Sequence, residues 1–161
     1  MAFYSIKFQQ EILKNSSSQI FSHACAEWSV LSCSTLDEDD DPQFCICSHE
    51  IKQLFTIENK LTDKILTIGC DCARHIPAIE KTEIYESALI NLRDLQKKKN
   101  KKINSSLILI LRENSILPEK QIDFLEDMKG KRKISEKQEK YYNDLINKLV
   151  KLYPKTIPIR Y

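Results

Sequence analysis

Apolar residues near the start of the chain recur at helical spacing. This spacing predicts a helix over residues 5–14, with Phe3, Ile6 and Leu13 on one side. A second apolar series, at residues 20–28, has the same period and predicts a second helix. A polar, serine-rich break separates the two series and can cap the second helix. The chain is therefore expected to open with two short helices.

Strand signals follow these helices. Residues 29–36 read as a short strand, and an acidic loop separates them from the next apolar series. Ile51, Phe55 and Ile57 then alternate with mostly polar residues, which is typical of a strand with one buried face. Another strand is expected over residues 65–68 after a turn. The last two strands are predicted to form a hairpin.

Helical spacing returns in the second half of the chain. Ile84, Ala88, Leu92 and Leu95 mark an amphipathic helix there. The apolar run 107–111 is interpreted as helix because its neighbours are helical. Pro118 can open a further helix that Gly130 ends. A capping box over 135–138 predicts the start of the last helix, and the prolines from Pro154 onward predict an extended tail.

Composition narrows the class of protein. The chain has 161 residues, of which 42% are hydrophobic and 30% charged, so it can build a core. Its longest aliphatic run, 107–111, is far too short for a membrane span, and its first residues do not resemble a secretory signal. With only Gly69 and Gly130, glycine-rich phosphate loops are excluded. We expect no membrane partner and an intracellular, reducing compartment, cytoplasmic or nuclear.

Charge is distributed unevenly along the chain. Residues 1–80 hold 6 basic and 12 acidic residues, a net charge of −6, whereas residues 81–161 hold 19 and 11, a net charge of +8. The expected organisation is a zinc-binding α+β module over 1–80 and a basic helical module over 81–161. A basic module suits an anionic partner, which is either nucleic acid or an acidic protein, although a solvated lysine-rich surface explains the same charge.

The cysteines supply the candidate chemistry. All six lie between Cys25 and Cys72, and four of them form two close pairs, Cys45-Ile-Cys47 and Cys70-Asp-Cys72. In a reducing compartment, clustered cysteines are more often metal ligands than disulfides. The predicted hairpin would bring the two pairs together around a tetrahedral Zn²⁺ ion. The expected ligands are Cys45, Cys47, Cys70 and Cys72.

The fourth ligand has alternatives. Cys70 competes with His75, with His49 and with Cys33 from the preceding strand. His75 lies three residues beyond Cys72, a spacing that shares one face of a helix. The resulting fold class is α+β: a zinc-stapled β-hairpin, treble-clef or zinc-ribbon-like, with flanking helices and a small helical bundle after it.

Several of these residues also form a recognisable pattern. The segments are Ala26-Glu-Trp28, Cys45-Ile-Cys47-Ser-His49, Ile51, Asn59, Thr62, Ile68-Gly69 and Cys72. Together they resemble small zinc-binding modules of viral, phage and protist proteins, which read C-x-C-G-x-x-I and [IV]-G-x-x-C-x-x-x-F in their central parts. The resemblance implies metal roles for Cys45, Cys47 and Cys72 but not for Cys70. This chain departs from it at Ser48, where the pattern has Gly, and at Ile76, where it has Phe.

A second resemblance lies in the basic module. Phe124-Leu125, the segment 133–138 and the segment 146–148 together resemble a helical motif of phage and viral proteins that accompany DNA-processing machinery. That motif reads F-L, then R-x-L-S-x-K-Q, then I-N-x-K. The capping box alone also explains much of this segment.

These observations predict a non-catalytic zinc module that associates with nucleic acid or its processing machinery. The residues expected to contact phosphate form two basic clusters, Lys97, Lys98, Lys99, Lys101 and Lys102 in one and Lys131, Arg132 and Lys133 in the other. One alternative is a protein–protein adaptor with a structural zinc. The other is a small zinc enzyme, in which Glu50 or Asp71 would act as a base at a three-ligand site.

Overall fold

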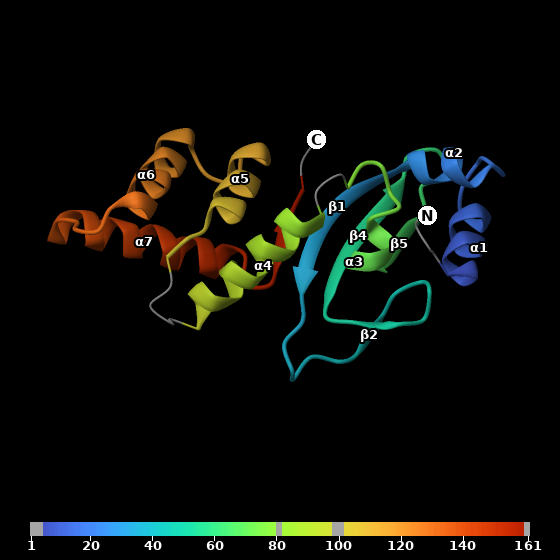
Figure 1. The fold of residues 1–161 in the computed structure, drawn as a ribbon, viewed down its shortest axis with the longest axis horizontal. Helices are drawn as coiled ribbons and strands as arrows, with labels where there is room; N and C mark the ends of the chain where they lie inside the picture. Colours follow the sequence, from blue (N-terminus) through green and yellow to red (C-terminus); the bar gives the residue numbers. More distant parts are fainter. Residues whose placement is uncertain (1–4, 80–81, 98–101, 160–161) are drawn as a thin grey trace. The chain divides into compact units, whose positions relative to one another are not determined.

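The computed structural model describes residues 5–79, 82–97 and 102–159. The protein is α+β, and its chain forms two compact units (Figure 1). Unit 1 comprises Met1–Thr82 and unit 2 comprises Glu83–Tyr161. Within the described residues, no helix combines the length and the apolar composition needed to cross a lipid bilayer.

Unit 1 begins with helix α1, Ile6–Lys14, in the place that the sequence predicts. Its start is fixed by Ser5, whose Oγ accepts a hydrogen bond from the Phe8 amide at 3.0 Å. The predicted buried face is wrong, because Phe8 and Ile12, one turn apart, are buried while Ile6 is 74% exposed. Phe3, which was assigned to the same face as Ile6, lies outside the described residues.

The second helix is shorter than predicted. Helix α2, Phe21–Ala26, ends before Trp28, which is instead the first residue of strand β1, Trp28–Thr35. Trp28 has helical spacing from Cys25, but its backbone pairs with Asn59 of the neighbouring strand. Tertiary strand pairing therefore overrides the local helical period at this point.

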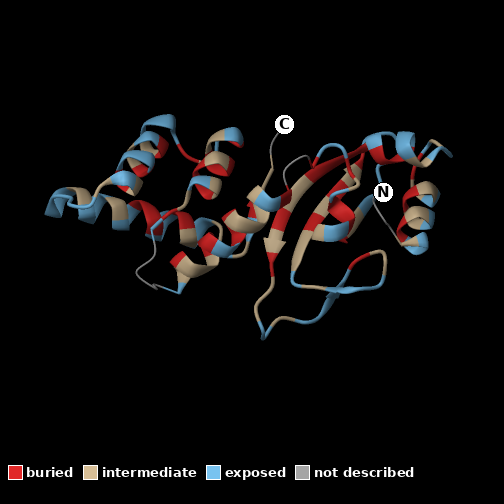
Figure 2. Ribbon diagram, viewed as in Figure 1, coloured by how far each residue is buried: buried red, intermediate tan, exposed pale blue. Residues whose placement is uncertain are grey.

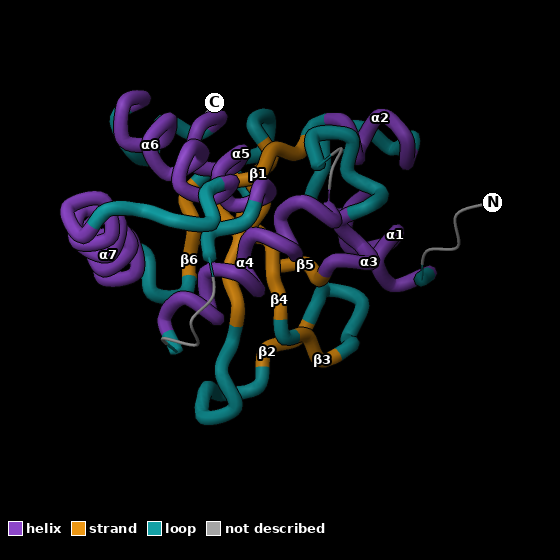
Figure 3. The backbone as a smooth tube through the Cα atoms, turned by 60° about the vertical axis from the view of Figure 1, so that its left-hand side comes forward, coloured by secondary structure: helices purple, strands orange, loops and turns teal. Residues whose placement is uncertain are grey.

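The sheet of unit 1 is antiparallel, with strand order β5-β4-β1 (Figure 3). Strand β4, Gln53–Asn59, and strand β5, Ile65–Gly69, form the predicted hairpin. Its buried side chains include Phe55, Ile57 and Ile68, none of which is exposed to solvent. Two elements that the sequence did not predict complete the unit: the ribbon β2–β3, Gln43–Phe44 with Glu50–Ile51, and helix α3, Cys70–Ala73.

A network of hydrogen bonds, here named the polar clasp, ties the tip of the β4–β5 hairpin to the α1–α2 loop. The clasp consists of Ser16, Glu27, Trp28, Asn59 and Thr62. The buried Asn59 side chain accepts from the Leu61 and Thr62 amides at 2.9 and 3.1 Å. It donates to the Glu27 carboxylate at 2.7 Å.

The remaining members of the clasp reach the α1–α2 loop. The Glu27 carboxylate accepts from the amides of Ser17 and Ser18 at 2.8 and 2.7 Å. The Trp28 indole donates to the Ser16 hydroxyl at 2.9 Å, and the Thr62 hydroxyl donates to the Asn15 carbonyl at 2.7 Å. Each of the five side chains of the polar clasp thus has at least one hydrogen-bond partner.

Unit 2 is helical apart from the short strand β6, Thr156–Pro158. Its helices are α4, Thr82–Gln96; α5, Ser105–Glu113; α6, Glu119–Gly130; and α7, Glu136–Leu152. The helical interpretation of 107–111 is confirmed by α5, and α6 ends at Gly130 as predicted. Each of these helices carries buried residues beside exposed ones (Figure 2).

The caps of unit 2 follow from local sequence. Ser135 and Gln138 form the predicted capping box at the start of α7, with both reciprocal hydrogen bonds present at 3.2 and 3.0 Å. Asn104 caps α5 by accepting from the Leu107 amide at 2.8 Å. On the surface, the Arg112 guanidinium of α5 donates to three carboxylates of α6, Glu119, Asp123 and Glu126, at 2.8 to 2.9 Å.

Candidate metal centre

The first part of the candidate centre is the tight turn between β2 and β3. Cys45 follows β2 directly, and its amide donates to the His49 carbonyl at 2.9 Å. The Ser48 amide closes the turn onto the Cys45 carbonyl at 2.7 Å, and Ser48 adopts φ 76°. This left-handed conformation costs any residue except Gly some strain, which fits the place where the resembled pattern has Gly. Lys7 of α1 donates a hydrogen bond to the Ser48 hydroxyl.

Strand β5 brings the second part of the centre to this turn. The Ile46 amide donates to the Thr67 carbonyl at 3.3 Å, so the turn lies along β5. At the end of β5, Gly69 leads directly into α3, which carries Cys72. A Cβ on Gly69 would lie 2.6 Å from Cγ2 of Ile51 and 4.0 Å from Cβ of Cys45. Gly69 therefore allows the close approach of the turn to β5 at the position of the cysteines.

Three thiols converge where the turn meets α3. The Sγ atoms of Cys45, Cys47 and Cys72, here named the thiol cluster, all lie within 4.8 Å of one another. Cys45 and Cys72 are buried and Cys47 is half-buried. A tetrahedral zinc ion with Zn–S bonds of about 2.3 Å separates its sulfur ligands by about 3.8 Å. The cluster thus has donor atoms and spacing that fit one thiolate-bound metal ion.

The electrostatics of the cluster favour one thiolate before any metal binds. The Cys72 thiol donates a hydrogen bond to Cys45, which lowers the pKa of Cys45 below its ordinary value despite the opposing effect of burial. Hydrogen bonds from the Cys47 and Gly69 amides also lower that pKa. The donating role and burial raise the pKa of Cys72 well above its usual range. A divalent cation would replace the shared protons, since thiolates are the metal-binding form.

His49 lies beside the cluster. Its Nδ1 is 3.3 Å from Sγ of Cys47, with the side chain at the open side of the turn. Such a distance suits two ligands of one zinc ion, because Zn–N bonds are about 2.0–2.1 Å long. His49 is therefore within reach of one cluster sulfur, that of Cys47, while the group of ligand atoms that all lie within 4.8 Å of one another in the described residues consists of the three cysteines.

The other candidate ligands lie elsewhere. Cys70 does not join the thiol cluster, and its Sγ lies 3.5 Å from Oε1 of Gln53. The physical reason is helix geometry: residues two apart on α3 point to different sides, so Cys70 and Cys72 cannot converge. Cys33 is fully buried in β1, in register with Phe55 of β4. The His75 ring packs against the Phe8 ring, with a centroid separation of 5.9 Å.

The predicted phosphate-binding residues are only partly described. Lys98, Lys99 and Lys101 lie outside the described residues, while Lys97 is exposed just after α4. Three of the others, Lys102, Lys131 and Arg132, line one hollow of unit 2, and Lys133 is exposed beside them. The structure thus groups residues of the two basic clusters that are far apart in sequence.

Comparison with protein families, curated proteins and solved structures gives no match to this chain. The interpretation of the site therefore rests on its own geometry and chemistry. The thiol cluster offers three soft ligands, and soft thiolates select zinc over hard cations such as Mg²⁺. Sequence reasoning identified these cysteines through their close spacing. It missed the contribution of Gly69, which becomes visible only once Ile51 lies against it.

Proposed function

We propose that unit 1 binds a structural zinc ion and that the protein is a non-catalytic zinc module that associates with nucleic acid. The ligands in this proposal are Cys45, Cys47, Cys72 and His49. The observation that carries it is the convergence of three sulfur atoms from two separate elements, the β2–β3 turn and α3. A knuckle-like turn and the first turn of a helix after a hairpin supply the ligands of a treble-clef arrangement, which we assign to this unit.

A structural role follows from the number of ligands. Four protein ligands fill a tetrahedral zinc site and leave no position for a reacting water molecule. Of the bases considered for an enzyme, Asp71 pairs with Arg74 at 3.3 Å and its side chain is 97% exposed. This arrangement supports a solvent-facing ion pair rather than a base held at the metal.

Nucleic-acid association is assigned to unit 2. Its chain segment from residue 81 onward carries a net charge of +8, and exposed lysines and arginine gather around the hollow lined by Lys102, Lys131 and Arg132. Contacts between such residues and phosphates release counterions, which gives binding that weakens steeply with salt. The adaptor alternative differs because an acidic protein would replace nucleic acid on the same surface.

The zinc proposal is tested by metal analysis of protein purified under reducing conditions, followed by cobalt substitution. We expect one zinc per chain and a cobalt spectrum whose sulfur charge-transfer intensity corresponds to three thiolates. His49→Ala should weaken metal binding, whereas the matched variants His75→Ala and Cys70→Ser should bind as the parent does. If Cys70→Ser loses the metal and His49→Ala retains it, the fourth ligand is Cys70 and not His49. A folded protein that binds no metal would overturn the proposal.

The nucleic-acid proposal is tested by retention on immobilised single-stranded and double-stranded DNA at increasing salt concentration. We expect retention at low salt, and a fall in affinity whose logarithm is linear in the logarithm of salt concentration. Absence of retention on DNA and on RNA at low salt, together with retention on an acidic polypeptide, would favour the adaptor.

A further inference from the structure

A small hollow in unit 2 joins the two basic clusters. It encloses about 160 Å³ and is lined by Lys102, Met128, Lys131, Arg132, Ile134 and Tyr142. These residues come from three segments: the stretch before α5, the end of α6 with the loop that follows it, and α7. We name this site the basic hollow. Its lining combines three cationic residues, Lys102, Lys131 and Arg132, here named the rim, with Met128, Ile134 and Tyr142, here named the floor.

The rim is positively charged and ordered by its own contacts. Nζ of Lys102 donates to the Lys131 carbonyl at 2.9 Å, which fixes Lys102 over the α6–α7 loop. Nζ of Lys131 pairs with the Asp127 carboxylate at 2.6 Å. Among the described residues, Arg132 has neither an ion-pair partner nor a hydrogen-bond partner, and it is exposed. The rim therefore presents an uncompensated guanidinium, whose planar donors suit phosphate oxygens.

The floor is apolar and includes one aromatic ring held in place. Met128 is buried, and the exposed edge of the floor is Ile134, which is 37% exposed. The half-buried Tyr142 accepts a hydrogen bond from the Ile103 amide at 2.9 Å through its hydroxyl. Because that contact fixes the hydroxyl end, the Tyr142 ring forms a positioned surface beside the cations.

The volume of the basic hollow limits the size of the group that can bind in it. A cavity of about 150 Å³ accommodates one benzene molecule, so the basic hollow has room for a single six-membered ring. Inorganic phosphate alone would pair with Arg132 but leave the apolar floor against water. A nucleotide of a single strand offers both parts, an anionic phosphate and a flat base with an apolar face.

We infer that the basic hollow receives one pyrimidine nucleotide of a single-stranded nucleic acid, with its base against Tyr142 and its phosphate at Arg132. This inference rests on the proposed association with nucleic acid and names the part of unit 2 that recognises it. Base stacking on an aromatic side chain adds affinity that does not depend on backbone charge. The hollow therefore adds a preference for unpaired bases to the salt-dependent attraction of the lysines.

The test compares two fluorescein-labelled probes of equal length, an oligothymidylate and its abasic counterpart, by fluorescence anisotropy. Both probes carry the same phosphates, and only the first carries bases. The oligothymidylate should bind about tenfold more tightly, within the range that a stacked base contributes. Tyr142→Leu should abolish this difference and leave the affinity for the abasic probe unchanged.

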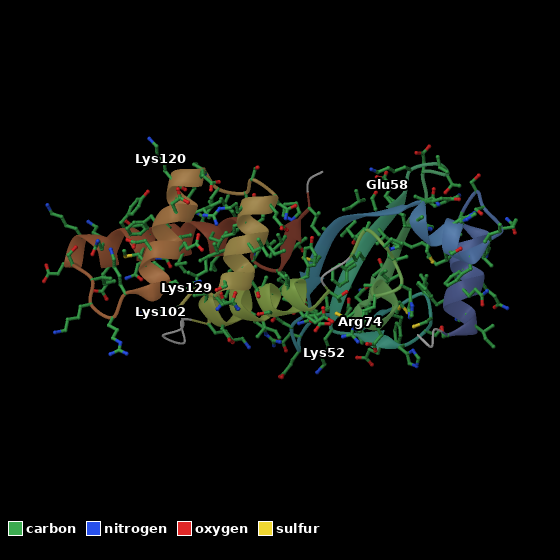
Figure 4. All side chains as sticks on the ribbon, turned by 45° about the horizontal axis from the view of Figure 1, so that its top comes forward. Lys52, Glu58, Arg74, Lys102, Lys120 and Lys129 are labelled. Atoms are coloured by element: carbon green, nitrogen blue, oxygen red, sulfur yellow. The ribbon has the colours of Figure 1, made fainter. Side chains whose placement is uncertain are left out.

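Arg132→Glu is the second variant, because it changes an exposed residue and should not disturb folding. Its matched control is Lys120→Glu, which reverses one positive charge on an exposed side chain in the first turn of α6. Lys129, in the last turn of α6, and Lys102 both lie far from Lys120 (Figure 4). Arg132→Glu should weaken oligothymidylate binding at least about fivefold more than Lys120→Glu does, as expected for loss of a direct phosphate contact.

The outcomes separate this inference from the proposal beneath it. Equal affinity for the two probes, or equal effects of Arg132→Glu and Lys120→Glu, would overturn the basic hollow as a nucleotide site while nucleic-acid association stands. Failure of both probes to bind at low salt would overturn the inference, and if double-stranded DNA and RNA are not retained either, nucleic-acid association falls with it. If Tyr142→Leu does not fold, as judged by circular dichroism, the comparison of the two probes and the charge-reversal pair still decide the inference.

Discussion

The two ends of the β4–β5 hairpin are closed by different chemistry. At the tip, the polar clasp gives the buried Asn59 side chain partners on the turn, on Glu27 and on Ser16. At the base, three thiols meet one another, nearby backbone amides and the ring of His49. At the tip the side chains are paired with one another by hydrogen bonds, whereas at the base the three sulfur atoms are placed so that they could bind a metal ion. One small sheet thus combines a closure that needs no ion with one that we expect to need zinc.

Removal of the metal should produce the largest effect and should act at the base. If zinc is present at about a thousand times its dissociation constant, its removal costs about 4 kcal/mol of stability. Cys72→Ser should reproduce this loss, while Cys70→Ser, two residues away, should not. Hydrogen exchange provides the measurement: the Ile46 amide at the base should lose protection on chelation. The Leu61 and Thr62 amides at the tip should remain protected, and equal loss at both ends would contradict the comparison.

Asn59→Ala should destabilise the polar clasp at the tip of the hairpin and leave metal binding at its base unchanged. The substitution removes the partner of the part-buried Leu61 and Thr62 amides and of the Glu27 carboxylate, and Asn59 itself is fully buried. Because each hydrogen bond to a backbone amide contributes about 1 kcal/mol, we expect a loss of about 2 kcal/mol. Denaturant unfolding measures this value. Thr62→Val, which removes one hydrogen bond, should cost about 1 kcal/mol. A fall in zinc content in either variant would show that the two ends are coupled.

The extent to which sequence anticipated these features depends on how local each signal is. The capping box of Ser135 and Gln138 was predicted because all of its atoms lie within one turn. Trp28 was misassigned to a helix because its apolar spacing is compatible with both elements, and its pairing with Asn59 decides between them. The clasp itself was not predicted, since Glu27 and Asn59 are 32 residues apart and meet only through the fold.

The cysteines show the same division. Their pairing in sequence predicted Cys45, Cys47, Cys70 and Cys72 as ligands. The structure brings the sulfur atoms of Cys45, Cys47 and Cys72 together, whereas Cys70, whose direction depends on α3, lies outside this group. The short β2–β3 ribbon was not predicted, because each of its strands has only two paired residues and this is too few to show an alternating pattern. The close spacing of the cysteines thus pointed to the thiol cluster, whereas the side chains that lie beside it became visible only in the geometry of a helix and a turn.

The acid stability of the tip should depend on Glu27. Burial would raise the pKa of this carboxyl group, but hydrogen bonds from Asn59 and from the Ser17 and Ser18 amides outweigh it and lower the pKa below its ordinary value of 4.5. A carboxyl whose pKa is lower in the folded state stabilises the protein above its unfolded-state pKa. That contribution is lost as pH falls through the folded-state pKa.

Thermal unfolding of Glu27→Gln across the acidic range measures this dependence. The parent should be more stable than the variant near neutral pH, and the difference should shrink as the pH falls below 4.5. Glu11→Gln, a change of the same charge elsewhere in unit 1, is the matched control and should leave the acid limb of the stability curve unchanged. A constant difference between Glu27→Gln and the parent at every pH would argue against the charged role of Glu27.

Ser48→Gly should change the stability of the protein least, and it should act at the base of the hairpin. Gly tolerates φ 76° without the clash that a Cβ causes, but it loses more entropy on folding and gives up the hydrogen bond from Lys7. We expect a gain of no more than about 1 kcal/mol, the lower limit of the left-handed penalty. Ser48→Val should instead lower the melting temperature and weaken zinc binding. Similar melting temperatures for the Gly and Val variants would show that this turn is not held in the left-handed conformation.

The position of Cys72 immediately beyond β5 has a consequence for how the hairpin finds its pairing. Leu54 pairs with Gly69 and Phe55 with Ile68 in the observed register. A slip of two residues would keep every side chain on its own face, so burial discriminates poorly against it. The same slip would carry Cys72 about 7 Å along the strand direction, which exceeds the spacing of the thiols. A bound ion would therefore stabilise the observed register of β4 and β5 and not the register shifted by two residues. Metal binding would thus select the correct pairing of the two strands.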